Sequence, residues 1–351
     1  MLEKKKEKNK HQRDLKCLFF RQIRFFTYIF INFFLIFLIK KLILYTKFIN
    51  YLFLVYPASE KELEYYWHKW YKKLAPNISI IGMIWDKNSK KRGIIITIPF
   101  LLEDIDGNYK KLKSIIDDAT RFADETKIQI IALAGQLPSL FLKNQIKLEK
   151  PFVKGDLGTV FSITESISEI IRVKGLANEK LKVGVVGIGF IGRKLAKDLV
   201  CMGFNMVIGI DDNKNKINQP ITGVRLSDSP ELLKICDIVI ILTSRGDDIL
   251  NKKDYFKCGV IIIDDTYPAI LKETVSLICQ ELNAEIYRTM IIGDSTKFVP
   301  SFPRFKNNWL PGCVIEAIVV SVFGREVLLL PEKFSQNAKS ISLKPLIVKC
   351  Y

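Results

Sequence analysis

Short apolar runs alternate with helical patterns over the second half of the chain. Five β-rich segments follow one another from Lys182 onward: KVGVVG, NMVIGID, DIVIIL, GVIIID and AEIYRTMII. Strands that alternate with helices are typical of a parallel sheet with helices on both faces. The pattern therefore predicts an α/β fold with a Rossmann-type, doubly wound parallel sheet over residues 177–298.

A second, smaller α/β unit precedes this sheet. Residues 78–85 and 92–100 have the pattern of strands, apolar positions recur at helical spacing over 112–123, and another strand is expected over 127–134. The predicted parts are a basic and apolar N-terminal segment (1–55), a small α/β substrate domain (56–155), a connecting helix (156–176), the Rossmann dinucleotide-binding domain (177–298), and a helix with the C-terminal tail (299–351).

The N-terminal segment combines positive charge with an uncharged run over residues 25–39. The first 50 residues hold twelve Lys and Arg and three Asp and Glu, so +9 of the net charge of +17 lies there. Fifteen helical residues reach about 22 Å, short of the bilayer core of about 30 Å. Three interpretations stay open: an interfacial or hairpin anchor, a single span, and sequence added by a wrongly chosen start codon.

These interpretations set the expected location. A membrane surface is a candidate partner of residues 1–55, and we expect a cytoplasmic protein, with peripheral attachment to or anchoring at the cytoplasmic face of the membrane as an open alternative. No recognisable strand or helix of either unit precedes Tyr56. We therefore expect the chain from Tyr56 onward to contain both cores.

Composition and charge exclude several classes of protein. Of the 351 residues 48% are hydrophobic and 26% are charged, which excludes a disordered chain. The sequence has no zinc finger, RNA-binding signature or basic heptad region, so we expect no nucleic-acid partner. Seven scattered cysteines and two histidines also argue against a Cys/His zinc site, and we predict no metal.

The strand KVGVVG runs directly into a glycine-rich turn at the start of a helix. Gly187, Gly189 and Gly192 have the G-x-G-x-x-G spacing, and Phe190 and Ile191 complete the turn. The first glycine permits a tight turn, the second lets the backbone approach a pyrophosphate, and the third lets helix and strand pack closely. We therefore predict a nicotinamide dinucleotide, NADPH or NADH, as cofactor.

Five residues beyond the turn bear on the choice of cofactor and its site. Asp211 ends the strand NMVIGID, where a carboxylate would bond the ribose hydroxyls and repel a 2′-phosphate, which favours NADH. Lys214 and Lys216, shortly after it, would weaken that preference. Thr243 and Ser244 follow the strand DIVIIL and are expected to flank the cofactor.

Cys313 differs in position from the other cysteines. It follows Pro311 and opens the apolar run CVIEAIVVSVF, so its thiol lies in the first turn of a predicted helix. The helix dipole lowers the pKa of a thiol there, which makes Cys313 a candidate nucleophile. Glu316, one turn later, is expected either to accept or relay a proton or to favour the N-terminal end of the helix.

Several segments occur in the order and spacing of a known enzyme family: GIIITIPFLLEDI, IIALAGQLPSLF, FVKGDLGTVFSITESI, IIIDDTYPAIL and GCVIEAIVV. Over residues 50–325 the chain resembles the soluble long-chain acyl-(acyl carrier protein) reductases, which form fatty aldehydes. The resemblance implies that Cys313 takes an acyl group from acyl carrier protein or acyl-CoA and that NADPH reduces the bound thioester. It also implies a substrate site at Gly155, Asp156 and Thr159.

The leading prediction is thus an enzyme, an NAD(P)H-dependent reductase of fatty acyl thioesters, and two alternatives stay open. A shikimate-dehydrogenase-like oxidoreductase has a similar pair of domains, but it needs a lysine and an aspartate together, for which Lys154 and Asp156 are the nearest candidates. The other alternative is a membrane-attached dinucleotide-binding protein without catalysis.

Overall fold

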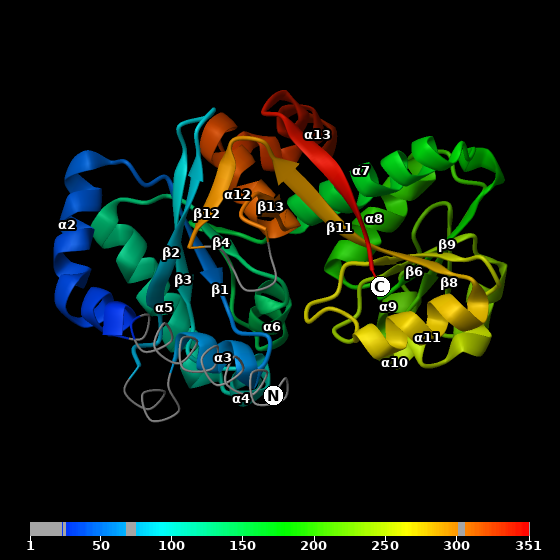
Figure 1. Ribbon diagram of the computed structural model, residues 1–351, viewed down its shortest axis with the longest axis horizontal. Helices are drawn as coiled ribbons and strands as arrows, with labels where there is room; N and C mark the ends of the chain where they lie inside the picture. Colours follow the sequence, from blue (N-terminus) through cyan, green and yellow to red (C-terminus); the bar gives the residue numbers. More distant parts are fainter. Residues whose placement is uncertain (1–22, 24–25, 68–74, 301–305, 351) are drawn as a thin grey trace, which may run out of the picture.

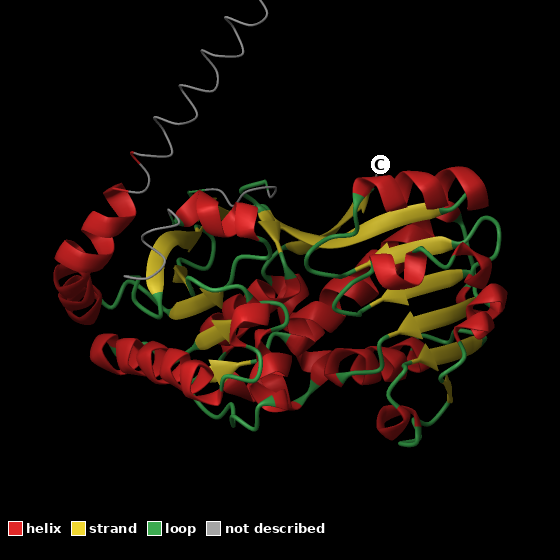
Figure 2. Cartoon of the chain, turned by 90° about the horizontal axis from the view of Figure 1, so that it is seen from below, coloured by secondary structure: helices red, strands yellow, loops and turns green. Residues whose placement is uncertain are grey.

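Two β-sheets lie side by side along the long axis of the molecule, each with its own helices (Figure 1). The computed structural model describes residues 23, 26–67, 75–300 and 306–350. Figure 2 shows the strands of both sheets and the helices that cover them. The predicted mixed α/β architecture with a Rossmann-type sheet is confirmed.

The first sheet has six strands in the order β12-β2-β3-β1-β4-β5. Strand β1 is parallel to β3 and β4, whereas β2 runs antiparallel to β3 and β12. The strands of this sheet are β1 (Tyr51–Val55), β2 (Ser79–Asp86), β3 (Arg92–Thr97), β4 (Ile131–Leu133), β5 (Phe152–Val153) and β12 (Thr296–Val299). The helices of this part are η1 (Phe30–Leu35), α2 (Ile36–Thr46), α3 (Glu60–Tyr66), α4 (Leu102–Ile105), α5 (Tyr109–Thr126) and α6 (Leu137–Lys143).

Strand β1 overturns the expectation that both cores begin at Tyr56. All five of its residues are buried, and it lies between β3 and β4 in the interior of the first sheet. The interpretation of the whole of residues 1–55 as a segment outside the fold is therefore wrong. The other limits of the predicted domains stay predictions. The helix predicted over 112–123 is confirmed, because the apolar face of α5 is buried against this sheet.

The chain before β1 forms a helix over residues 26–46 that includes η1 and α2. It is longer than the run of fifteen uncharged residues indicated, and at about 1.5 Å per residue its 21 residues would reach about 31 Å. By length and composition alone it could cross a membrane. It nevertheless packs along α5 and β2 of the first unit, with Ile43 in the core.

The second sheet contains the predicted parallel strands in the order β11-β10-β9-β6-β7-β8, and β13 and β14 are antiparallel to β11. Its strands are β6 (Lys182–Val186), β7 (Met206–Ile210), β8 (Val224–Ser227), β9 (Ile238–Ile241), β10 (Ile261–Asp264), β11 (Glu285–Gly293), β13 (Trp309–Leu310) and β14 (Leu343–Lys349). Its shorter helices are η3 (Asn178–Lys180), α9 (Lys214–Ile217), η4 (Pro230–Ile235), α10 (Asp247–Leu250), η5 (Lys253–Tyr255) and α11 (Lys272–Leu282). Strand β8 was not predicted from the sequence, because it is partly polar.

Long helices join the two sheets. They are α7 (Asp156–Lys174), α8 (Phe190–Cys201) and α12 (Gly312–Phe323), followed by η6 (Arg325–Leu329) and α13 (Pro331–Ser340). Helix α7 packs on α12 and on α8. At the crossing of α7 and α12 a Cβ on Gly158 would overlap the carbonyl oxygen of Gly312, so the two backbones are in direct contact. This contact sets where the start of α12 lies relative to the first sheet.

Candidate active site

A cleft of about 1390 Å³ opens between the two sheets. Residues that follow the carboxyl ends of β1, β4, β6, β7, β9 and β10 line it. In parallel sheets ligands bind at this edge, where the strand order reverses. In the second sheet the order reverses between β6 and β9, directly at the cleft.

The glycine turn forms one wall of the cleft, as predicted. Gly187 has a φ of 98°, which favours glycine, and a Cβ on Gly192 would overlap the carbonyl oxygen of Gly187. A Cβ on Gly189 would meet nothing within 4 Å, so this backbone is open to a ligand. Ile191 also lines the cleft. Phe190 points elsewhere, with the ammonium of Lys194 4.6 Å from its ring centroid.

Asp211 lies at the predicted place, but its carboxylate is already engaged. It accepts hydrogen bonds from the backbone N–H groups of Ile188 (2.8 Å) and Asn213 (3.0 Å). The ammonium of Lys216 lies 2.9 Å from the same carboxylate. The charge that was expected to repel a 2′-phosphate is therefore paired with a cation at the edge of the cleft.

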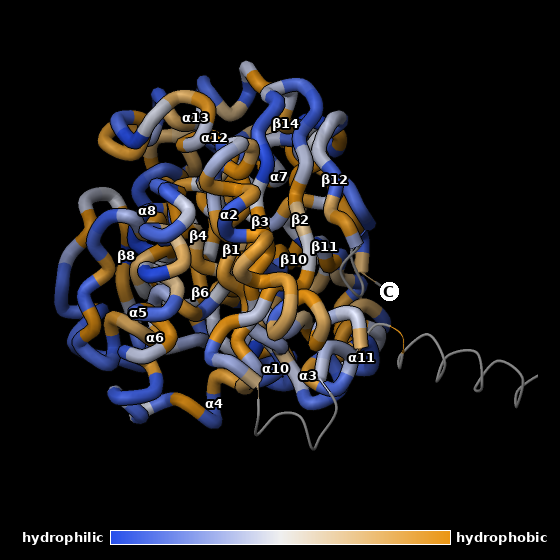
Figure 3. Tube along the Cα trace, turned by 90° about the vertical axis from the view of Figure 1, so that its left-hand side faces the viewer, coloured by the Kyte–Doolittle hydropathy of each residue, from blue (hydrophilic) through white to orange (hydrophobic). Residues whose placement is uncertain are grey.

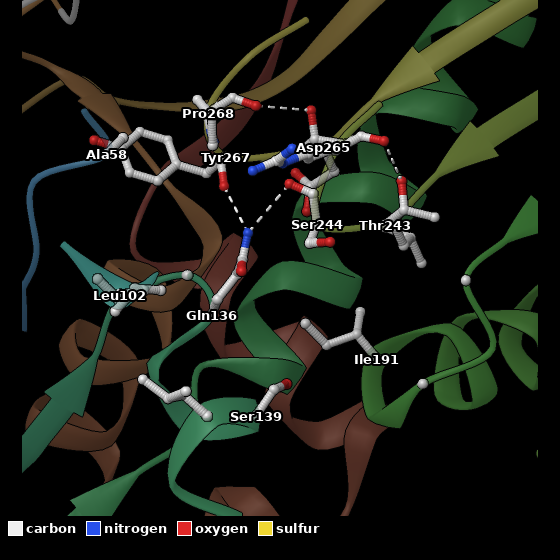
Figure 4. A pocket seen from close by; sticks show the side chains of 18 of the residues that line it. Ala58, Leu102, Gln136, Ser139, Ile191, Thr243, Ser244, Asp265, Tyr267 and Pro268 are labelled. Carbon is white, nitrogen blue, oxygen red and sulfur yellow. Dashed lines mark hydrogen bonds between the residues drawn. The ribbon is translucent and has the colours of Figure 1, made fainter. Parts of the chain in front are cut away.

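Thr243 and Ser244 line the cleft after β9, as expected. The Thr243 hydroxyl donates to the carbonyl of Arg245 within its own loop (3.1 Å). Gln136 of the first unit reaches across the cleft, and its side-chain N–H₂ donates to the carbonyls of Ser244 (3.3 Å) and Tyr267 (2.8 Å) (Figure 4). These hydrogen bonds connect the loop after β4 of the first sheet to two loops of the second sheet.

Cys313 lies in the first turn of α12 and borders the cleft, as predicted, but its thiol is not activated. Burial raises the pKa of Cys313 to about 11, and the negative charge of Asp265 acts in the same direction. Backbone hydrogen bonds from Gly135 and Val314 oppose this increase without cancelling it. The expectation of a lowered thiol pKa is wrong, because loss of hydration outweighs the helix dipole.

Glu316 does not line the cleft. Its buried carboxylate accepts the N–H groups of Gly155 (3.0 Å), Leu157 (2.8 Å) and Gly158 (3.3 Å) at the start of α7. Burial, followed by the charge of Asp156, raises the pKa of Glu316 to about 7. The geometry gives Glu316 the role of holding the start of α7 against α12.

The substrate residues implied by the resemblance are only partly at the cleft. Thr159 lines it and donates its hydroxyl to the carbonyl of Gly155 (2.7 Å). Gly155 has a φ of 75° and does not line the cleft. The buried Asp156 does not line it either and forms an ion pair with Lys194. Lys154 instead lies 5.2 Å from the ring centroid of Phe190.

A polar group in the cleft centred on Asp265 and Tyr267 was not predicted from the sequence. Burial raises the pKa of Asp265 to about 7, and the hydroxyl of Thr289 donates to its carboxylate. The Tyr267 hydroxyl donates to Glu62 (3.0 Å), and burial raises its pKa as well. The hydroxyl of Tyr56 accepts the N–H of Gln136 (3.2 Å). Asp265, Tyr267 and Tyr56 closely follow β10 and β1, so their positions after strands were the available signal.

Among the described residues, no group of three or more His, Cys, Asp or Glu has an arrangement that could hold a metal ion. The polar groups of the cleft are carboxyl, phenol, hydroxyl, amide, thiol, ammonium and guanidinium groups. They suit proton transfer and the binding of a polar substrate beside a dinucleotide.

Comparison with known proteins finds relatives of the second unit. The family described as "D-isomer specific 2-hydroxyacid dehydrogenase, NAD binding domain" matches residues 166–263. NAD-dependent malic enzyme 1 of Bacillus subtilis is 29% identical over 108 residues, which are 30% of this chain and 24% of that enzyme. The chain thus spans about a quarter of the length of this curated relative.

Solved structures of D-2-hydroxyacid dehydrogenases are also similar. D-lactate dehydrogenase of Escherichia coli is 13% identical, with 68% of this chain and 81% of that chain covered and a TM-score of 0.32. A D-2-hydroxyisocaproate dehydrogenase is 13% identical, with 67% and 77% covered and a TM-score of 0.32. A D-isomer specific 2-hydroxyacid dehydrogenase of Xanthobacter autotrophicus is 18% identical, with 38% of this chain and 65% of that chain covered and a TM-score of 0.30. That dehydrogenase was crystallised in complex with NADPH.

The family match corrects the expected function. The predicted membership of the acyl-(acyl carrier protein) reductases is wrong, and so are fatty aldehyde formation from a thioester and the acyl carrier protein or acyl-CoA partner. Dinucleotide enzymes share the strand, glycine turn and helix, so this order could not separate the families. The two alternatives fail too, and Asp156 pairs with Lys194 rather than Lys154.

The prediction of a nicotinamide cofactor is confirmed, whereas the predicted fatty acyl substrate is wrong. The matched residues contain the glycine turn, Asp211 and the loop after β9, all of which line the cleft. Residues 166–263 are therefore similar to the NAD-binding domain of D-isomer specific 2-hydroxyacid dehydrogenases, which supports an NAD-dependent oxidoreductase.

Proposed function

We propose that the protein interconverts a small 2-hydroxy acid and the corresponding 2-oxo acid, with NAD(H) or NADP(H) as hydride carrier. The observation that carries this proposal is the position of Asp265, a carboxyl group with a pKa of about 7, in the same cleft as the glycine turn. The family match of residues 166–263 and the malic enzyme relative support an acid as substrate.

The reaction needs one proton acceptor besides the cofactor. Oxidation moves a hydride from C2 of the hydroxy acid to the nicotinamide and a proton from its hydroxyl group to a base. A base is most effective when its pKa lies near the working pH. Asp265 meets this condition, and its hydrogen bond with Thr289 holds the carboxylate in place. In the reverse direction the protonated carboxyl returns the proton to the carbonyl oxygen.

Binding of the substrate carboxylate requires a cation. Lys154 and Arg245 both line the cleft, and neither forms an ion pair with another residue in the part of the chain that the structure describes. A guanidinium group binds a carboxylate through two parallel hydrogen bonds, whereas an ammonium group acts as a point charge. We assign carboxylate binding to Arg245 and a supporting charge to Lys154.

The test is a spectrophotometric screen of 2-hydroxy acids and 2-oxo acids of two to six carbons, both enantiomers included, with each nicotinamide cofactor. The Asp265→Asn variant keeps the size of the side chain but cannot accept the proton. We expect it to lose at least about 100-fold in kcat while NADH affinity changes less than about twofold. Asp248→Asn is the matched control, because Asp248 also lines the cleft but is exposed on α10.

Two results would contradict the proposal. One is the absence of turnover for every acid in the screen by a protein that binds NADH. The other is an Asp265→Asn variant with the same kcat as the Asp248→Asn control.

A further inference from the structure

The helix over residues 26–46 has one face built into the first α/β unit. The Asn32 side chain accepts the N–H of Ile80 (2.6 Å) and donates to the carbonyl of Ile80 (3.0 Å), so it pairs with the backbone of β2. The ammonium of Lys40 lies 2.6 Å from the carboxylate of Glu125 on α5. Ile43 is 1% exposed in the core. These contacts fix how the helix is rotated about its axis.

The opposite face of the same helix is a continuous stripe of exposed apolar side chains. Nearly all follow one another at intervals of three or four residues, which places them on one side of the helix. Phe34 is 69% exposed and Tyr45 is 79% exposed, among the highest values for large apolar residues of the described chain. We call this stripe the outer apolar face, and its members are Phe26, Phe30, Phe33, Phe34, Phe37, Leu38, Leu42 and Tyr45.

Figure 3 looks directly onto this helix and shows hydrophobic residues along α2. Contiguous apolar patches on soluble proteins mark surfaces that bind a protein or a membrane. The charge of the surrounding sequence distinguishes between these two kinds of partner.

Basic residues outnumber acidic residues in and before the helix that carries the outer apolar face. The sequence has no Asp or Glu from residue 15 to residue 59, whereas Lys40, Lys41 and Lys47 lie within or next to the helix. The first 24 residues add nine Lys and Arg against three Asp and Glu. Basic charge next to an exposed apolar helix face is the combination that binds anionic lipid surfaces.

We propose that the outer apolar face docks this protein on an anionic membrane surface, with the helix over residues 26–46 lying in the plane of the interface. The apolar side chains enter the boundary between headgroups and acyl chains, and the exposed Lys41 and Lys47 face the lipid phosphates. The proposal is independent of the proposed enzymatic function.

The packing of the inner face argues against a helix that spans the bilayer. A span would separate Asn32 from the backbone of β2 and Lys40 from Glu125. It would also expose both polar side chains to hydrocarbon, which is costly. Strand β1 begins five residues after Thr46 inside the first sheet, so the helix stays close to that sheet. An interfacial position keeps all of these contacts.

The test is sedimentation of the full chain with preformed vesicles, either of phosphatidylcholine alone or with about one third phosphatidylglycerol. We expect binding to the anionic vesicles to be at least tenfold stronger and to weaken in high salt. The triple variant Phe30→Ser, Phe34→Ser, Phe37→Ser removes the centre of the outer apolar face. We expect it to lose vesicle binding at least tenfold while NADH binding is unchanged.

A matched control changes three exposed leucines elsewhere: Leu277→Ser, Leu329→Ser, Leu330→Ser. This variant should bind vesicles like the wild type. Protein bound to vesicles should also transfer to an excess of unlabelled anionic vesicles, because surface binding is reversible.

Several outcomes would overturn the proposal. They are no binding to anionic vesicles, equal loss of binding in the control variant, and failure to transfer between vesicles, which indicates a spanning helix. A dimer in sedimentation velocity that the triple variant abolishes, without vesicle binding by the wild type, would assign the outer apolar face to contact between two copies of the chain.

Discussion

Removal of residues 1–55 is expected to unfold the first α/β unit, although the composition of that segment suggests a dispensable extension. The deletion takes away β1, which pairs with β3 on one side and β4 on the other. Its five side chains are at most 9% exposed. Full burial of a large apolar side chain is worth about 1.5–3 kcal/mol, so β1 contributes about 8–15 kcal/mol. That equals the whole unfolding free energy of a typical domain, about 5–15 kcal/mol.

The matched comparison is a variant that lacks only residues 1–24, which keeps both β1 and the helix over residues 26–46. We expect this variant to unfold cooperatively in a thermal scan followed by circular dichroism and to bind NADH like the full chain. The variant without residues 1–55 should aggregate or show no cooperative transition for the first unit. A cooperative transition in that variant within a few degrees of the full chain would refute the reasoning.

Four further results are expected. With the carboxylate of Asp265 as the proposed base, kcat for oxidation should rise with pH through about 7 and kcat for reduction should fall, and Asp265→Asn should remove the inflection in a pH profile. Lys216→Ala should weaken NADPH binding by about tenfold and NADH binding by less than about twofold in a fluorescence titration, since Lys216 is the cation paired with Asp211 at the predicted ribose site. Alkylation of Cys313 by iodoacetamide, mapped by mass spectrometry, should be slow at pH 7.5 and accelerate up to about pH 10, because its thiol pKa is about 11. Glu316→Ala should lower the unfolding free energy by about 3 kcal/mol or more in a denaturant titration, because three buried N–H groups lose their acceptor.

The cofactor site could be predicted from sequence because its elements are neighbours in the chain. The strand, the three glycines and the helix that follow one another from Lys182 form the turn by local geometry alone. The place of Cys313 in the first turn of a helix was predictable for the same reason. Neither pattern specifies a substrate, because a dinucleotide site serves many reactions.

Strand β1 was missed because burial on both faces removes the alternation of apolar and polar residues. The run YLFLV follows another apolar segment closely, so periodicity cannot separate strand from helix there. Only its position between β3 and β4 identifies it as a central strand.

The sequence by itself determined the two α/β units, the dinucleotide turn and the start of the cysteine helix, since each depends on residues close together in the chain. The tertiary structure decided the chemistry of the cleft. The carboxylate of Glu316 binds backbone about 160 positions earlier, and the pKa of the Cys313 thiol depends on Gly135 and Asp265, which follow strands of two different sheets. Burial and charge around a side chain come from these distant contacts, so pKa values and roles follow from the fold rather than from local spacing.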